Sequence, residues 1–156
     1  MSQLMNSIGK NARKASLKRV NTKLKDKVLK KYLSLLDKEK NAIFKANKKD
    51  LKFALNKKLK SNLINRLVIN HIKLNEIKNS IKKIIKLKDP IDKTLKSWTR
   101  PNGLKIRKVS IPIGVIGVIY ESRPNVTSDV ASLCFKSGNS VILKGGSEAT
   151  DTCKMI

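Results

Sequence analysis

The chain has 156 residues, of which 40% are hydrophobic and 4% aromatic, and its formal net charge is +25. This length and composition suit one ordinary domain, or a small domain and part of another, and they exclude a compositionally disordered chain. The sequence has no run of 18 apolar residues that could span a membrane, and its two cysteines cannot form a disulfide framework. Its start has no apolar core of a secretory signal, so we expect a cytoplasmic protein.

The positive charge is concentrated in the first hundred residues, and such a field attracts polyanions. Only six of the 36 basic residues are arginine, whereas proteins that read nucleic-acid bases rely on arginine and aromatic side chains. We therefore interpret the lysines mainly as solvated outer faces of helices. A lysine-rich nucleic-acid-binding remnant is kept as an alternative.

Residues 12–88 have helical periodicity. The first pattern places its apolar residues on one face at Leu17, Val20, Leu24, Val28, Tyr32 and Leu35. A second helix is predicted over residues 40–59. A third is predicted from Ser61, as its N-cap, through Ile84, ending before Asp89-Pro90. His71 lies within the third pattern with no cysteine or carboxylate at ligand spacing, so no metal site is expected.

The pattern changes at Trp98, where a Pro-Asn-Gly turn is followed by period-two alternation from Leu104 to Ile111, typical of a strand. Then come a buried strand "VIGVIY", a helix ended by Gly138-Asn139, a buried strand "SVILK" and the start of another helix. The apolar face of the first of these helices is predicted at Val126, Val130, Leu133 and Cys134. The order predicts the α/β class, with a parallel sheet and a right-handed crossover.

Two turns follow these predicted parallel strands, residues 121–125 and 144–148, and ligands bind at the carboxyl ends of such strands. Gly145 and Gly146 let a ligand approach the backbone, Ser147 can cap the helix, and the free amides favour phosphate. Lys144 offers a donor to ribose or phosphate, and Glu148 can accept from a hydroxyl. The spacing suits a nucleotide pocket, and it equally suits a plain strand-to-helix turn with a helix cap.

The segment from Leu104 to Ala149 carries the motifs "YESRPNVT", at Tyr120–Thr127, and "FKSGNSVILKGGSEA", at Phe135–Ala149. With these motifs the chain strongly resembles the glutamate-5-semialdehyde dehydrogenase family, also called gamma-glutamyl phosphate reductases, of the aldehyde dehydrogenase superfamily. The resemblance implies an open parallel cofactor-binding sheet. It also implies an oxidoreductase of proline biosynthesis, which converts gamma-glutamyl phosphate and NADPH to glutamate 5-semialdehyde, phosphate and NADP.

The resemblance also implies roles for the two turns. Lys144 and Glu148 would contact the adenosine ribose of NADP(H), and Gly145, Gly146 and Ser147 would line the approach. Asn125 is the nearest equivalent of the superfamily's oxyanion-stabilising asparagine. Arg123 is a candidate for the substrate carboxylate or phosphate, or for an ion pair with Glu121.

The resemblance implies that the family's nucleophilic cysteine lies beyond Ile156. Cys134 and Cys153 are interpreted as structural, since neither has a histidine or carboxylate set out to lower its pKa. We therefore expect residues 1–97 to form an N-terminal helical region and residues 98–156 to begin the NADP-binding α/β domain. Such a chain lacks the catalytic domain and would be inactive alone. An alternative is a split subunit that pairs with a separate catalytic half, and strands such as Leu104–Ser110 could support a homo-oligomer.

Overall fold

A computed structural model of the chain describes residues 3–156. Its helices are α1 (Gln3–Ser16), α2 (Thr22–Lys38), α3 (Lys40–Asn56), α4 (Ser61–Leu67), α5 (His71–Lys86), α6 (Pro124–Lys136) and α7 (Thr150–Met155), with a 3-10 turn η1 (Ser147–Ala149). Its strands are β1 (Thr94–Thr99), β2 (Lys105–Val109), β3 (Val115–Ile119) and β4 (Ser140–Lys144). The predicted α/β class is confirmed.

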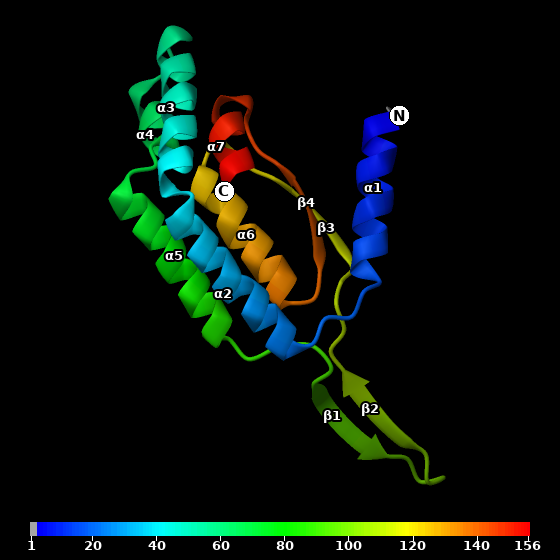
Figure 1. Ribbon diagram of the computed structural model, residues 1–156. Coiled ribbons are helices and arrows are strands. Elements are labelled where there is room, and N and C mark those ends of the chain that lie inside the picture. The colour runs from blue at the N-terminus through cyan, green and yellow to red at the C-terminus, as the bar shows by residue number, and fades with distance from the viewer. Residues whose placement is uncertain (1–2) are drawn as a thin grey trace.

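The strands form two separate pairs, an antiparallel β1–β2 hairpin and a parallel β3–β4 pair. Helix α6 lies between the parallel strands and the helices α2 and α5, and α1 lies on the other side of those strands (Figure 1). The hairpin projects away from this body (Figure 1). None of the helices in the described part of the chain is both long enough and apolar enough to cross a membrane.

The predicted strand–helix–strand unit is confirmed. β3 and β4 pair in parallel, from Val115 opposite Ser140 to Ile119 opposite Lys144. Gly138 ends α6 with a φ of +71°, and its amide donates to the carbonyl of Phe135 over 3.0 Å. Because φ is positive there, glycine is the residue that closes this helix without strain.

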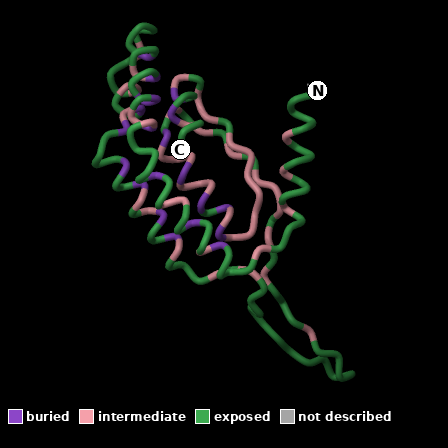
Figure 2. Tube along the Cα trace, in the orientation of Figure 1, coloured by how far each residue is buried: buried purple, intermediate pink, exposed green. Residues whose placement is uncertain are grey.

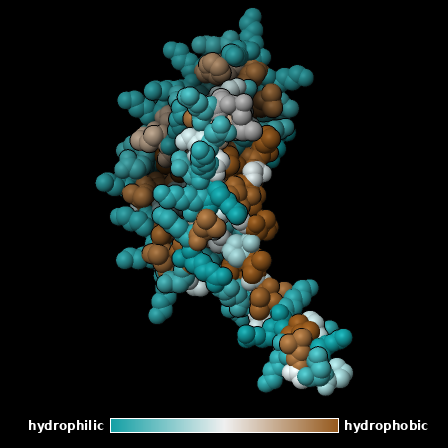
Figure 3. Space-filling view, turned by 90° about the vertical axis from the view of Figure 1, so that its right-hand side faces the viewer, coloured by the Kyte–Doolittle hydropathy of each residue, from teal (hydrophilic) through white to brown (hydrophobic). Residues whose placement is uncertain are grey.

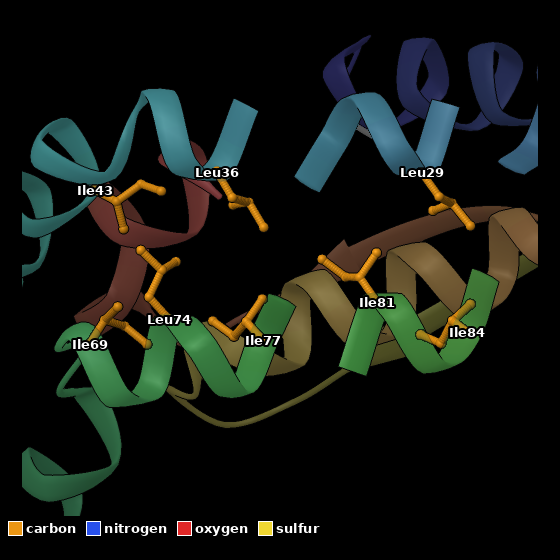
Figure 4. Close-up of a cluster of buried hydrophobic side chains, with 8 residues drawn as sticks. All are labelled: Leu29, Leu36, Ile43, Ile69, Leu74, Ile77, Ile81 and Ile84. Atoms are coloured by element: carbon orange, nitrogen blue, oxygen red, sulfur yellow. The ribbon is translucent and has the colours of Figure 1, made fainter. Parts of the chain in front are cut away.

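The larger hydrophobic core joins helices α2, α3 and α5. Its buried members are Leu29, Leu36, Ile43, Ile69, Leu74, Ile77, Ile81 and Ile84, and the side chains of α2 and α5 point toward one another across it (Figure 4). Phe135 of α6 and Ile156 pack against the same cluster. The N-terminal helices and the parallel unit are therefore in direct contact, and the division at residues 97 and 98 stays a prediction.

The face predicted for the first helix is wrong except at Tyr32, which is partly buried and packs against the core. Leu17 and Val20 lie in a break between α1 and α2, and Leu24, Val28 and Leu35 are exposed. The buried face is one position further on, at Lys25, Leu29 and Leu36. Asn21 explains the difference, since its side chain accepts a hydrogen bond from the Leu24 amide over 2.9 Å and starts a new helix after the break.

The third predicted helix is two helices, α4 and α5. The loop between them is held by Asn47 of α3, which donates to the Leu67 carbonyl over 2.7 Å and accepts from the Ile69 amide over 2.9 Å. Asn70 then caps α5 by accepting from the Lys73 amide. Ser61 is the first residue of α4 rather than its N-cap, which is Lys60.

The remaining differences concern exposure. The sequence did not predict β1. The strands "VIGVIY" and "SVILK", expected to be buried, are only partly buried because a two-stranded sheet is incompletely covered, and Ile119 is 87% exposed. On α6, Leu133 is exposed, while Ser128 and Ser132 are buried. Buried positions gather on α2, α5 and α6, and the hairpin is largely exposed (Figure 2). Hydrophobic surface runs down one edge of the molecule and onto the hairpin (Figure 3).

Candidate functional site

The two predicted ligand-binding turns lie side by side at one edge of the parallel pair. Because β3 and β4 are in register, their carboxyl ends meet there, and the amide of Tyr120 donates to the carbonyl of Lys144 over 3.1 Å. The structure thus brings residues 121–125 and residues 144–148 together. Such an edge is where open α/β sheets bind their ligands.

Gly146 lies at the closest approach of the two turns. A Cβ at this position would be 2.1 Å from Ser122 Oγ and 2.7 Å from Glu148 Oε2, so any larger residue would displace one of them. Ser122 Oγ donates to Glu148 Oε2 over 2.5 Å, and Ser147 Oγ donates to Glu148 Oε1 over 3.2 Å. Ser122 was missed from the sequence, where a serine in a polar turn gives no sign of its partner 26 residues away.

Glu148 is held in its ionised form. The hydrogen bond from Ser122 and the bond from its own backbone amide lower the pKa of the Glu148 carboxyl below its ordinary value, against the opposing effect of burial. The charge of Lys57 adds a smaller contribution in the same direction. An ionised carboxylate accepts hydrogen bonds only, which is the chemistry that a pair of ribose hydroxyls requires.

Lys144 and Gly145 complete this turn. The Lys144 ammonium is exposed and donates to the Gly145 carbonyl over 3.2 Å. A Cβ on Gly145 would lie 3.1 Å from the hydroxyl oxygen of Tyr120, whose own bond to Thr127 Oγ1 is 2.7 Å long. The Tyr120 side chain therefore fills the space beside Gly145, and a larger residue at position 145 would contact its ring.

A buried polar network anchors the helix that follows the turn. Asp50 of α3 accepts hydrogen bonds from the Asp151 amide, the Thr152 amide and the Thr152 hydroxyl, at 3.2, 2.8 and 2.6 Å. Asn47 donates to the same hydroxyl over 3.1 Å. The carboxylate satisfies amides that the first turn of α7 leaves free, so α3 holds the start of the helix that follows the turn.

A cavity of about 490 Å³ opens beside the first turn, between α4, α5 and α6. Its polar lining includes Arg66, Lys73, Glu76, Arg123, Asn125 and Asp129. Glu121 pairs with Arg66 at 2.5 Å, whereas Arg123 Nε is 4.0 Å from the same carboxylate oxygen. The tight partner of Glu121 is thus Arg66, which leaves the Arg123 guanidinium available to the cavity.

The two cysteines differ in burial. Cys134 is buried, and burial raises the pKa of its thiol, which keeps it protonated. Cys153 is partly buried and is a free thiol. Among residues 3–156 no group of three or more histidine, cysteine, aspartate or glutamate side chains is placed to hold a metal ion.

The chain has the parallel unit of an α/β protein, with a glycine-rich turn at the edge where open sheets of this class bind ligands. No family model matches the chain. It is 48% identical to the gamma-glutamyl phosphate reductase of Nitratiruptor sp. over 142 residues, 91% of this chain and 34% of that protein. It is 45% identical to the protein of the same name from Clostridium tetani over 150 residues, 95% of this chain and 35% of that protein.

Solved structures agree. Gamma-glutamyl phosphate reductase from Thermotoga maritima superposes with a TM-score of 0.93 at 38% identity, covering 99% of this chain and 37% of that one. The Saccharomyces cerevisiae reductase gives 0.91 at 37% identity, with 99% and 40% covered. The chain belongs to the gamma-glutamyl phosphate reductase family. It spans about a third of the length of the curated relatives that it matches.

Proposed function

We propose that the chain supplies the first strands of the NADP(H)-binding site of a reductase that converts gamma-glutamyl phosphate to glutamate 5-semialdehyde in proline biosynthesis, in the cytoplasm. The names of its relatives support the reaction. The observation that carries the cofactor role is the turn around Gly146, where a side-chain-free position faces an ionised Glu148. The family relationship favours this function over nucleic-acid binding.

The residues present fit a dinucleotide. In this proposal Glu148 accepts from the adenosine ribose, Lys144 donates to a ribose hydroxyl or phosphate, and Gly145, Gly146 and Ser147 leave room for the backbone approach. The nicotinamide, when bound, supplies the hydride. Ser122 positions Glu148 through its 2.5 Å hydrogen bond.

The first turn faces the substrate in the same proposal. Asn125 would donate to the acyl oxygen as negative charge develops on it, and Arg123 would bind an anionic group of the substrate. We infer that the nucleophilic thiolate, which displaces phosphate to leave a thioester, lies outside residues 1–156. The chain alone would therefore bind cofactor without turnover. The exposed hairpin offers a surface for a separate catalytic half or for a second copy.

The test of the cofactor role is the affinity of the chain for NADPH and for NADH, measured by isothermal titration calorimetry. We expect Gly146→Ala to weaken NADPH binding at least tenfold, because the new methyl group displaces Ser122 or Glu148. Gly117→Ala is the matched control, since a Cβ on Gly117 meets no described atom within 4 Å. Equal affinities of Gly146→Ala and Gly117→Ala would contradict the proposed cofactor site.

The test of the reaction is a fusion of this chain to the remaining two thirds of the Thermotoga maritima reductase. We expect the fusion to reduce gamma-glutamyl phosphate with NADPH and the 156-residue chain to show no turnover. An inactive but folded fusion would contradict the proposed reaction.

A further inference from the structure

The cavity between α4, α5 and α6 contains ionised groups of both signs, and most of them already have partners. Arg66 is paired with Glu121 at 2.5 Å, and Lys73 is paired with Glu76 at 2.8 Å. Arg123 and Asp129 have no ion pair shorter than 4.0 Å among the described residues. The cavity therefore presents one cationic and one anionic side chain without a close protein partner.

Of these two side chains, Asp129 is the one with a buried polar atom. Its Oδ1 atom is buried and has no hydrogen-bond partner among residues 3–156. A buried polar atom without a hydrogen-bond partner destabilises the folded chain, so it calls for a physical explanation. Asp129 also lines the cavity and has no ion pair among the described residues, so a cation bound there would lie beside an unpaired carboxylate.

The spacing on α6 relates Asp129 to the reacting end of the substrate. Asn125 and Asp129 both line the cavity and are four residues apart on the same helix face, about 6 Å along the axis. In a gamma-glutamyl group, the acyl carbon and the α-nitrogen are separated by four bonds of about 1.5 Å, or roughly 5 Å when extended. One helical turn thus matches the distance from the acyl group to the α-ammonium.

We propose that this cavity binds the α-amino-acid end of the substrate. The Asp129 carboxylate accepts hydrogen bonds from the α-ammonium, and the long Arg123 side chain extends along the cavity to bind the α-carboxylate on the same carbon. This assignment rests on the proposed function for the identity of the substrate. It makes Asp129 a specificity residue, one that distinguishes an α-amino acid from a plain dicarboxylate.

The direct test measures binding of L-glutamate and of glutarate, which lacks the α-ammonium, to the 156-residue chain by NMR titration. We expect the wild type to bind L-glutamate at least tenfold more tightly than glutarate, and Asp129→Asn to remove that preference. Asp129→Glu keeps the charge and retains a preference of at least threefold. Asp37→Asn, which removes an exposed carboxylate on α2 paired with Lys78, is the matched control and retains the full preference.

Far-UV circular dichroism establishes that each variant is folded before its affinities are compared. Equal binding of the two ligands by the wild type, or a preference that survives in Asp129→Asn, would overturn the assignment. Removing a carboxylate that lacks a partner should not lower the melting temperature, so loss of binding through unfolding is distinguishable.

The fusion enzyme separates this inference from the proposed function. In the reverse, phosphate-dependent reaction, Asp129→Asn should raise KM for glutamate 5-semialdehyde about tenfold and leave KM for 5-oxopentanoate, which lacks the amino group, unchanged. An active fusion whose two KM values respond equally overturns the role of Asp129 alone. An inactive fusion accompanied by a preference for L-glutamate overturns the reaction and supports the binding site.

Discussion

Thr152→Val tests whether the buried network on α3 anchors the helix after the cofactor turn. Thr152 is fully buried at 0% exposure, and its hydroxyl donates to Asp50 over 2.6 Å and accepts from Asn47 over 3.1 Å. Valine has nearly the same shape, so the substitution removes the hydroxyl and leaves the packing of α7 on α3 in place.

The size of the effect follows from what each partner retains. Asp50 keeps the Thr152 amide at 2.8 Å, and Asn47 keeps the Leu67 carbonyl at 2.7 Å, so neither loses all of its partners. The main loss is one hydrogen bond to a charged group, worth about 1.5–3 kcal/mol. For a chain of this length 1 kcal/mol shifts the melting temperature by about 2–4 °C, so we expect a decrease of about 3–12 °C.

The measurement is thermal unfolding followed by circular dichroism at 222 nm. Thr150→Val is the matched control, because the Thr150 hydroxyl is on the same segment but exposed, and it donates to the Ser147 carbonyl over 2.9 Å. The control should stay within about 0.5 kcal/mol of the wild type. If Thr152→Val destabilises the chain no more than the control does, the network does not hold α7 in place.

Two further predictions concern charged groups. Ser122→Ala should raise the pKa of the Glu148 carboxyl, measured by carbon-detected NMR titration. Because this pKa is lowered in the folded state, the ionised carboxylate stabilises the fold at neutral pH, and that stabilisation is lost as the pH falls through the pKa. The free energies of unfolding of wild type and variant should therefore converge in acid. An unchanged pKa would remove Ser122 from its role. Asp89→Asn should cost about 3–5 kcal/mol in urea unfolding, because it leaves Lys25, whose side chain is 3% exposed, without its 2.8 Å partner. Asp92→Asn, in an exposed pair, should cost under about 1 kcal/mol, and equal costs would contradict the argument.

The parallel unit could be predicted from the sequence because its signals are local. Short apolar runs bounded by Gly138 and by Gly145-Gly146 define the strands and turns, and parallel strands must present their carboxyl ends at one edge. The sequence therefore predicts that Lys144 and Glu148 lie near the first turn. The structure adds the hydrogen bond from Ser122, which depends on the register of β3 against β4.

The helical part was harder because its faces depend on long-range pairs. Lysines were expected on solvated faces, yet Lys25 and Lys136 are buried and pair with Asp89 at 2.8 Å and Asp26 at 2.6 Å. Each partner lies more than 60 residues away in the sequence. The spacing of apolar residues along a helix gives no sign of such an ion pair. The predicted buried face of α2 was therefore displaced by one residue from the observed one.

The same distance argument applies to the interior of the site. In the sequence, Asn47 and Asp50 look like ordinary polar residues of a lysine-rich helix, and their partners on α7 are 101 to 105 residues away. Their burial, at 2% and 5% exposure, is the signal that sequence alone cannot supply. Asn47 and Asp50 share one face of α3 with Ile43 and Ala46, and this spacing was the sequence's indication that they are buried.

The position of Trp98 has a practical consequence for following this protein in solution. It is the sequence's single tryptophan, and it lies on the projecting hairpin, 39% exposed, with the Lys96 ammonium 5.9 Å from its ring centre. Its emission therefore reports on the surroundings of the hairpin, while the helical core has no tryptophan of its own. A blue shift on mixing with another chain would signal that this strand pair has become covered, independently of any change in the far-ultraviolet signal of the helices.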